Sequence, residues 1–182
     1  MCIMKHQPPD WECKYGHSEI VEGVLYLAGE DDVDILLYGS EEAKNINGKG
    51  RFLKEPVPQI DVWIDLRDIR DTNRTVFIPE QVEYISIPFH DGKLDEAREH
   101  LPHALQALTD RMDKNKRVLV SCHQGRSRSV MLLLWYLSQK ERSFMDAYWT
   151  IKGKRPIMEP DKNFKPLIEE WKNLYPLEKT GW

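Results

Sequence analysis

Cysteine is scarce in this chain, and long apolar runs are missing. An odd count of three cysteines does not suit a disulfide framework, so we expect a reducing compartment, the cytoplasm. No apolar run approaches the length that spans a membrane, and residues 1–9 hold no signal-peptide core. The sequence therefore predicts no membrane association.

A strong charge of either sign is also missing. The net charge is −4, which does not favour nucleic acid or an anionic membrane as a partner. Hydrophobic residues make up 41% and charged residues 31% of the 182, typical of a globular chain with one core. We find no internal repeat and no linker that would divide the chain.

The most informative stretch is the octet Cys122–Ser129, with the sequence CHQGRSRS. Residues 117–121 before it are typical of a buried strand, and the Leu-rich residues 130–137 after it predict a buried helix. Backbone N–H groups in such a strand-to-helix turn lack partners and favour an anion. Arg128 adds a planar fork suited to phosphate oxygens, and the same field favours the thiolate of Cys122, a nucleophile.

With Gly125 inside it and Ser129 after Arg128, this octet resembles the signature loop of the cysteine-dependent protein phosphatases. Its Gly-x-Ser-Arg-Ser ending is most similar to the dual-specificity branch. The resemblance implies that Cys122 attacks phosphorus and that Ser129 donates a hydrogen bond to the sulfur. It implies no cofactor and no metal. The phosphate-binding residues it implies are His123, Gln124, Gly125, Arg126, Ser127 and Arg128.

A carboxylic acid on a loop is needed to protonate the leaving group. Asp91 follows a predicted strand directly, so it should emerge at the sheet edge that carries Cys122, at a separation similar to that of the family's general acid. Asp95 is the rival candidate, although its place at a helix start suits a favourable charge there. We expect Asp65 and Asp68 to be loop or salt-bridge residues.

The chain departs from the family pattern at Ser121, because a histidine usually precedes the cysteine. A serine hydroxyl can bond the loop backbone but brings no cationic ring, so the thiolate should be less favoured. We expect the side chain of His123 to face outward as a pocket wall. Arg126 is expected to be exposed, either solvated or favouring acidic or doubly phosphorylated substrates.

The remaining chain predicts an α/β fold, in which a mainly parallel sheet of about four to five strands is flanked by helices, as in dual-specificity phosphatases. Further strands are expected at 24–28, 62–66 and 82–87, and further helices at 94–112, 143–153 and 164–175. Turn formers and charge between 29 and 60 predict a loop with a helical piece near 41–45, and 67–71 should form a surface loop.

We expect a catalytic domain at 18–175, an extension at 1–17 and a tail at 176–182. The extension contains Cys2, His6, Cys13 and His17, which could bind zinc. Because their spacing is short and two prolines interrupt it, we favour packing of Trp11 and Tyr15 on the core.

The function predicted is hydrolysis of phosphotyrosine and of phosphoserine or phosphothreonine in proteins. Alternatives are a phosphatase of a phosphoinositide, RNA 5′-triphosphate or glucan, and a non-enzymatic phosphate-binding module. The loop lacks the extra lysine or the Thr after its arginine that lipid and RNA relatives tend to carry. A mere binder would need no nucleophile. The expected partner is a phosphorylated protein; the oligomeric state is not predicted.

Overall fold

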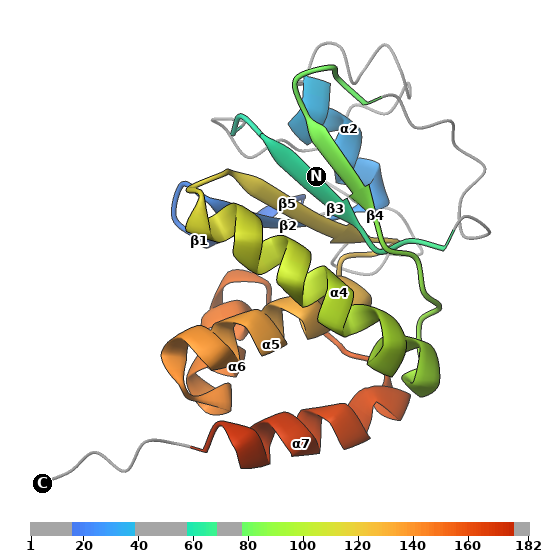
Figure 1. Cartoon of the computed structure of the whole chain (residues 1–182), viewed down its shortest axis with the longest axis vertical. Coiled ribbons are helices and arrows are strands. Elements are labelled where there is room, and N and C mark those ends of the chain that lie inside the picture. The colour runs from blue at the N-terminus through green and yellow to red at the C-terminus, as the bar shows by residue number, and fades with distance from the viewer. Residues whose placement is uncertain (1–15, 39–57, 69–77, 177–182) are drawn as a thin grey trace, which may run out of the picture.

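The computed structural model describes residues 16–38, 58–68 and 78–176 (Figure 1). Strands and helices are interspersed as far as residue 122, and the regular elements after that residue are all helical. The elements are β1 Ser18–Val21, β2 Leu25–Gly29, α2 Glu30–Tyr38, β3 Val62–Asp65, β4 Glu83–Ser86, α4 Leu94–Asp113, β5 Val118–Cys122, α5 Arg128–Glu141, α6 Phe144–Lys154, the 3-10 turn η2 Lys162–Phe164 and α7 Lys165–Leu174.

The strands form one five-stranded sheet in the order β1-β2-β5-β3-β4. β2, β5, β3 and β4 run parallel, and β1 adds an antiparallel edge. Gly29 at the end of β2 lies opposite Cys122 at the end of β5, and Asp65 of β3 lies opposite Ser121. The carboxyl ends of three strands therefore meet where the predicted site begins.

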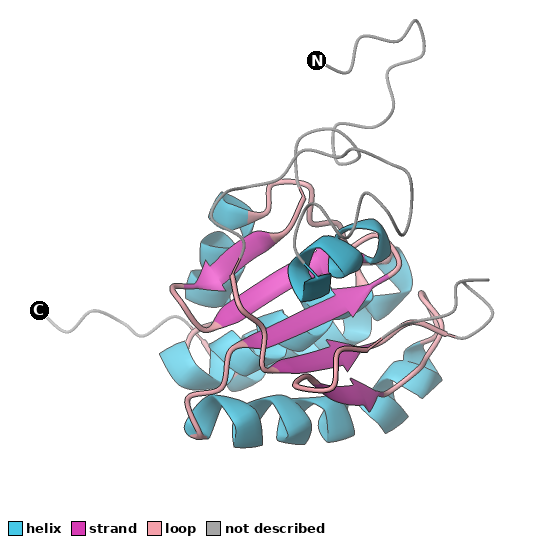
Figure 2. Cartoon of the chain, turned by 90° about the horizontal axis from the view of Figure 1, so that it is seen from above, coloured by secondary structure: helices cyan, strands magenta, loops and turns pink. Residues whose placement is uncertain are grey.

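Helices cover both faces of the sheet, as Figures 1 and 2 show. Alternate residues of β2 and β3 point to opposite faces, as the pleat of a strand requires. On one face Leu25, Leu27 and Ile64 pack with α4, α5 and α6, and on the other Tyr26 and Trp63 pack with α2. This arrangement confirms the predicted α/β class with a mainly parallel sheet.

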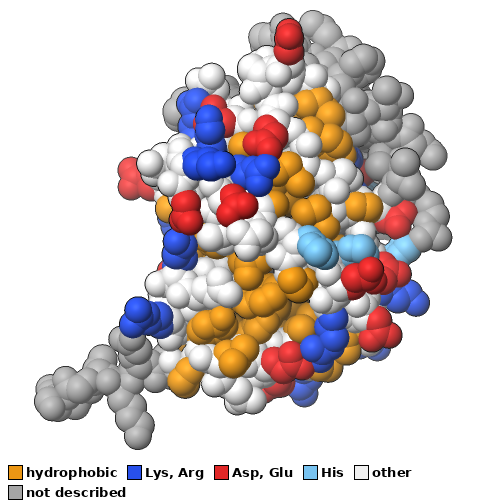
Figure 3. Space-filling view, viewed as in Figure 1, with side chains coloured by type: hydrophobic (Ala, Val, Ile, Leu, Met, Phe, Trp, Pro, Cys, Tyr) orange, Lys and Arg blue, Asp and Glu red, His pale blue; other side chains and the backbone are white. Residues whose placement is uncertain are grey.

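In Figure 3 acidic and basic side chains are interspersed at the upper left and again at the lower right of the molecule. Apolar side chains gather lower down, around a hollow between α4 and α7 that Leu101, Trp135 and Trp171 help to line. Within the described ranges, no helix is long and apolar enough to cross a membrane.

Two elements differ from the sequence prediction. Residues 30–38, predicted as loop, form α2, whose Val33, Leu36 and Leu37 are buried against the sheet. The sequence did not predict β1, because this strand, Ser18–Val21, has only four residues and therefore a short pattern of alternating burial. The helical piece predicted near 41–45 and most of the predicted loop lie outside the described residues.

Residues 67–71 were predicted to form a surface loop, but the first two of them are buried. Arg67 and Asp68 are 6% and 9% exposed. Arg67 binds Asp65 with Nε at 2.9 Å from Oδ1 and Nη2 at 2.8 Å from Oδ2, and Tyr84 also donates to Asp65. The prediction that Asp65 is a salt-bridge residue is confirmed. Burial and then the Asp65 carboxylate raise the pKa of Tyr84 to about 12.

Candidate active site

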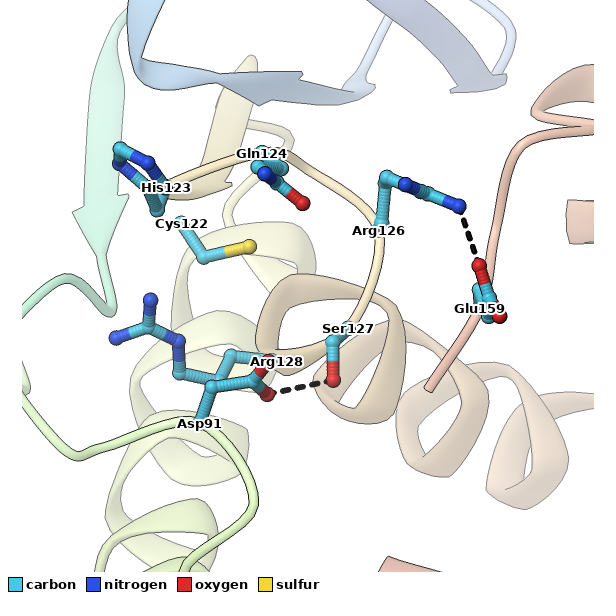
Figure 4. A pocket seen from close by; sticks show the side chains of 8 residues that line it. All are labelled: Asp91, Cys122, His123, Gln124, Arg126, Ser127, Arg128 and Glu159. Carbon is cyan, nitrogen blue, oxygen red and sulfur yellow. Dashed lines mark hydrogen bonds and ion pairs between the residues drawn. The ribbon is translucent and has the colours of Figure 1, made fainter. Parts of the chain in front are cut away.

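A pocket of about 310 Å³ opens at the carboxyl end of β5 (Figure 4). The turn that joins β5 to α5 forms its floor, and the loop before α4 and the segment before η2 form its sides. It is lined by Asp91, Cys122, His123, Gln124, Arg126, Ser127, Arg128 and Glu159. The structure thus brings the predicted nucleophile, arginine and general acid into one pocket.

Cys122 is a buried thiol at the bottom of this pocket. Its Sγ lies 3.0 Å from Oγ of Ser129, which is fully buried in the first turn of α5. Arg128 begins the same helix, and its Nη1 donates to the carbonyl oxygen of Phe89 at 2.8 Å. The guanidinium is therefore held in place by backbone before any ligand binds.

Gly125 gives the turn a shape that another residue could not adopt. Its φ of +64° lies in the left-handed region. A Cβ at this position would come within 2.6 Å of Nη2 of Arg155 and 2.7 Å of the Ala28 carbonyl carbon. The loop therefore lies directly against the end of β2 and against Arg155.

Arg155 holds the pocket loop in place, although nothing in the sequence around it predicts a place in the site. It is 1% exposed, and its Nε donates to the Gly125 carbonyl at 2.5 Å while Nη1 donates to Gly16 and Ser18, each at 3.0 Å. Burial lowers the pKa of Arg155 to about 10, so it remains charged at neutral pH. Its local sequence could not show this role, because its partners lie thirty or more residues away, in the pocket loop and in β1.

Asp91 lies on the loop before α4, beside the Ser127 end of the pocket loop, and its side chain is exposed. Its Oδ1 accepts a hydrogen bond of 2.6 Å from the hydroxyl of Ser127. Asp95 is also exposed but lies in the first turn of α4 and does not line the pocket. The geometry favours Asp91 over Asp95 as the acid.

His90 fixes the loop that carries Asp91. Its Nδ1 lies 2.8 Å from Oε2 of Glu96 in α4, and its Nε2 lies 2.9 Å from Oδ2 of Asp68 after β3. The backbone N–H of His90 also donates to Glu96. These bonds, the backbone one first, lower the pKa of Glu96. The loop is thus tied to two elements next to the acid.

The rim of the pocket differs from the prediction at Arg126. Arg126 is not an exposed loop residue, because its guanidinium pairs with Glu159 and its Nε donates to the Ile157 carbonyl at 3.1 Å. The charge of Arg126 is therefore paired with the acidic side chain of Glu159, whereas the sequence predicted an exposed arginine. The prediction for His123 agrees with its position, because its half-exposed ring lies on the pocket wall with Nδ1 3.1 Å from Oε2 of Glu30.

Ser121 bonds a core side chain and not the loop backbone that the sequence suggested as its partner. Its hydroxyl accepts a hydrogen bond of 2.8 Å from Nε1 of Trp63. Both residues are fully buried, and the Trp63 ring lies 4.7 Å from that of Tyr84. The serine thus satisfies a buried tryptophan at the position where the family usually has histidine.

The candidate zinc ligands of the N-terminal extension lie mostly outside the described residues, so the zinc alternative stays a prediction. Within residues 16–38, 58–68 and 78–176, no group of three or more His, Cys, Asp or Glu side chains could hold a metal ion. Cys2, His6 and Cys13 lie outside the described residues, while His17 is buried and its ring makes an edge contact with that of Tyr26.

Comparison with known proteins agrees with this geometry. The model of the family "Dual specificity phosphatase, catalytic domain" matches residues 53–174. Dual specificity protein phosphatase 9 of Homo sapiens is 32% identical over 97 residues, which cover 53% of this chain and 25% of that protein. Dual specificity protein phosphatase 6 of Homo sapiens is 35% identical over 85 residues, 46% of this chain and 22% of that protein.

Solved structures show the same fold. The crystal structure of human DUSP28 superposes with a TM-score of 0.60 at 20% sequence identity, covering 91% of this chain and 95% of that one. This chain spans only a quarter or less of the two sequence relatives, so it matches one part of each. Since the family match covers most of the chain, including the whole pocket loop, this chain belongs to the dual specificity phosphatase catalytic-domain family.

Proposed function

We propose that the chain hydrolyses phosphotyrosine and phosphoserine or phosphothreonine in proteins through a phosphocysteine intermediate. The observation that carries this proposal is the 3.0 Å contact between Cys122 and Ser129 in a pocket that also holds Arg128 and Asp91. A phosphate-binding module would need the arginine and the amides but neither a nucleophile nor an acid.

In the first step the Cys122 thiolate attacks phosphorus. The S–P bond forms as the bond from phosphorus to the leaving oxygen breaks, and Asp91 gives that oxygen its proton. Arg128 and the loop amides stabilise the charge on the equatorial oxygens. Phe89 fixes Nη1 of Arg128, which lowers the cost of ordering this side chain when substrate binds.

In the second step water replaces the sulfur. Asp91, now a carboxylate, takes a proton from the water as the P–O bond forms and the S–P bond breaks. Ser129 donates a hydrogen bond to the departing sulfur, which its position next to Sγ allows. The thiolate of Cys122 is restored, and inorganic phosphate leaves.

A phosphorylated protein is the substrate that the family supports, and the relatives' names include dual specificity. The pocket loop offers no lysine for the additional phosphates of an inositol lipid or an RNA 5′-triphosphate. Because a nucleophilic thiolate needs to stay reduced, we also propose a cytoplasmic location.

Turnover of an aryl phosphate and of phosphotyrosine and phosphoserine peptides by wild type tests this function. Cys122→Ser should abolish turnover while phosphate binding and the fold remain, and Arg128→Lys should fail badly because an ammonium cannot form the bidentate fork. Appreciable turnover by Cys122→Ser would reject the mechanism. Faster turnover of an inositol phospholipid or an RNA triphosphate would reject the substrate class.

A further inference from the structure

We propose that the Ser127 side chain positions the general acid and selects the oxygen of Asp91 that carries the catalytic proton. Ser127 enters the proposed function only through its backbone amide, and its hydroxyl has a separate role here. This inference rests on the proposed function.

The hydroxyl of Ser127 lies between two groups that fix its direction. The backbone N–H of Asp161 donates to Oγ at 2.8 Å, and Oγ donates to Oδ1 of Asp91 at 2.6 Å. A serine hydroxyl has one hydrogen to donate. Since the Asp161 N–H occupies an acceptor position of Oγ, that hydrogen is directed to Asp91.

The three segments that meet here are tightly fitted. Gly92 follows Asp91 with φ of +72°, and a Cβ at Gly92 would come within 3.0 Å of the Asp161 carboxylate. Ser127 is 8% exposed, whereas Asp91 is exposed. The buried serine and the neighbouring Asp161 therefore form a fixed support for an acid that reaches into the open pocket.

The direction of this bond decides where the proton of the acid lies. A protonated carboxyl has one O–H and one carbonyl oxygen, and an incoming donor favours the carbonyl oxygen. Ser127 donates to Oδ1, so the proton is placed on Oδ2, which has no protein partner among the described residues. Oδ2–H can then donate to the leaving oxygen, and Asp91 is left as a carboxylate that Ser127 still bonds.

This arrangement joins the acid to the phosphate-binding loop. Ser127 directly precedes Arg128, so one turn both binds the phosphate and orients the proton donor. The rate of an enzymatic reaction falls steeply when a catalytic group is displaced from its productive position. The hydroxyl should therefore matter for substrates that need a proton and much less for substrates that do not.

Ser127→Ala tests this dependence on the leaving group. On a phosphotyrosine peptide kcat should fall about tenfold, and on an aryl phosphate with a very acidic phenol about twofold, from loss of the hydrogen bond that orients the acid. Ser127→Thr keeps a hydroxyl and should recover most of the peptide rate. Equal losses on the two substrates, or no recovery by threonine, would overturn the proposal.

A double-mutant cycle separates a positioning role from general damage to the loop. Asp91→Asn should slow the peptide reaction by about 100-fold or more. In that background Ser127→Ala should cause no further loss specific to the peptide, because the group that it orients is gone. Losses that multiply would show that Ser127 acts elsewhere.

Asp161 offers a matched pair of variants. Its φ of −55° suits proline, so Asp161→Pro removes the N–H that bonds Ser127 with little change of backbone angle. Asp161→Ala keeps that N–H, and both variants lose the side-chain bond to the Asn163 N–H. The peptide-specific loss should appear in Asp161→Pro and not in Asp161→Ala; the reverse would overturn the proposal.

A measurement without turnover distinguishes failure of this inference from failure of the proposed function. The carboxyl ¹³C resonance of Asp91, identified by its disappearance in Asp91→Asn, should move in Ser127→Ala and stay near its wild-type position in Ser127→Thr. An unmoved resonance in Ser127→Ala overturns the inference even if the enzyme is active. An inactive wild type overturns the proposed function even if the resonance moves.

Discussion

At the scale of single residues, the loop depends on close backbone contacts as much as on reactive side chains. Gly125 lies at φ +64° within contact distance of β2, and a Cβ at Gly29 would come within 3.0 Å of the Gln124 backbone. Two glycines thus let the loop approach the end of β2, where its amides can line the pocket.

Ser121 provides a residue-scale prediction about stability. Ser121→Ala should reduce the free energy of unfolding by about 1–3 kcal/mol, because Nε1 of Trp63 would be left buried without an acceptor. Urea unfolding measures this. Ser138→Ala is the matched control, since that hydroxyl is equally buried but only donates to the Leu134 carbonyl within α5. A smaller loss in Ser121→Ala than in Ser138→Ala would contradict the role given to this bond.

The sequence could place the reactive residues but not their neutralising partners. Cys122 and Arg128 share one short motif, and Asp91 follows a strand whose carboxyl end reaches the same sheet edge. The partner of Arg126 is Glu159, more than thirty residues away, and Ser121 bonds Trp63 from another strand. Such pairs depend on tertiary packing, which neither residue's local sequence encodes.

At the scale of elements, periodicity predicted the long helices well. α4 and α7 each carry an apolar face in their sequence, and Ser143 caps α6 by accepting the Asp146 N–H at 3.2 Å. Helix α2 was missed because acidic residues open it and its buried apolar stretch is short. Acidic side chains in a first turn favour a helix, so charge alone was a poor sign of a loop there.

Arg155 joins several elements, and its replacement is our element-scale prediction. Arg155→Lys should lower the free energy of unfolding by about 2–4 kcal/mol and reduce kcat, because a lysine cannot reach the Gly125 carbonyl and β1 together. Thermal unfolding and aryl phosphate turnover measure the two effects.

The control for this variant is Arg98→Lys, at an exposed ion pair with Glu170. Its effect on stability should stay within about 0.5 kcal/mol. Equal effects of the two substitutions would mean that the buried network around Arg155 does not hold the loop.

At the scale of the whole molecule, ion pairs at the sheet make stability depend on pH. Hydrogen bonds from Arg117 lower the pKa of Asp61 below 3.8, and bonds from Arg111 lower that of Glu83. A carboxyl with a lowered folded pKa contributes stability above its unfolded pKa and loses it as pH falls through the folded value.

Asp61→Asn should therefore lower stability at neutral pH and make little difference well below pH 3.8, where the wild-type carboxyl also becomes neutral. Urea unfolding at the two pH values gives this comparison. Asp110→Asn, at a half-buried residue that accepts a hydrogen bond from Gln106 in the same helix, is the control. A difference between Asp61→Asn and wild type that grows in acid would have the wrong sign.

The same whole-molecule arrangement brings distant segments to one edge of the sheet, where Cys122, Arg128 and Asp91 meet in one pocket. The central claim is that Cys122 forms a covalent bond to phosphorus. Rapid quenching of wild type with a phosphotyrosine peptide, followed by mass spectrometry, tests it most directly. We predict phosphate on Cys122 in wild type and none in Cys122→Ser. Phosphate on another residue, or steady turnover with no phosphorylated cysteine at any quench time, would contradict the account.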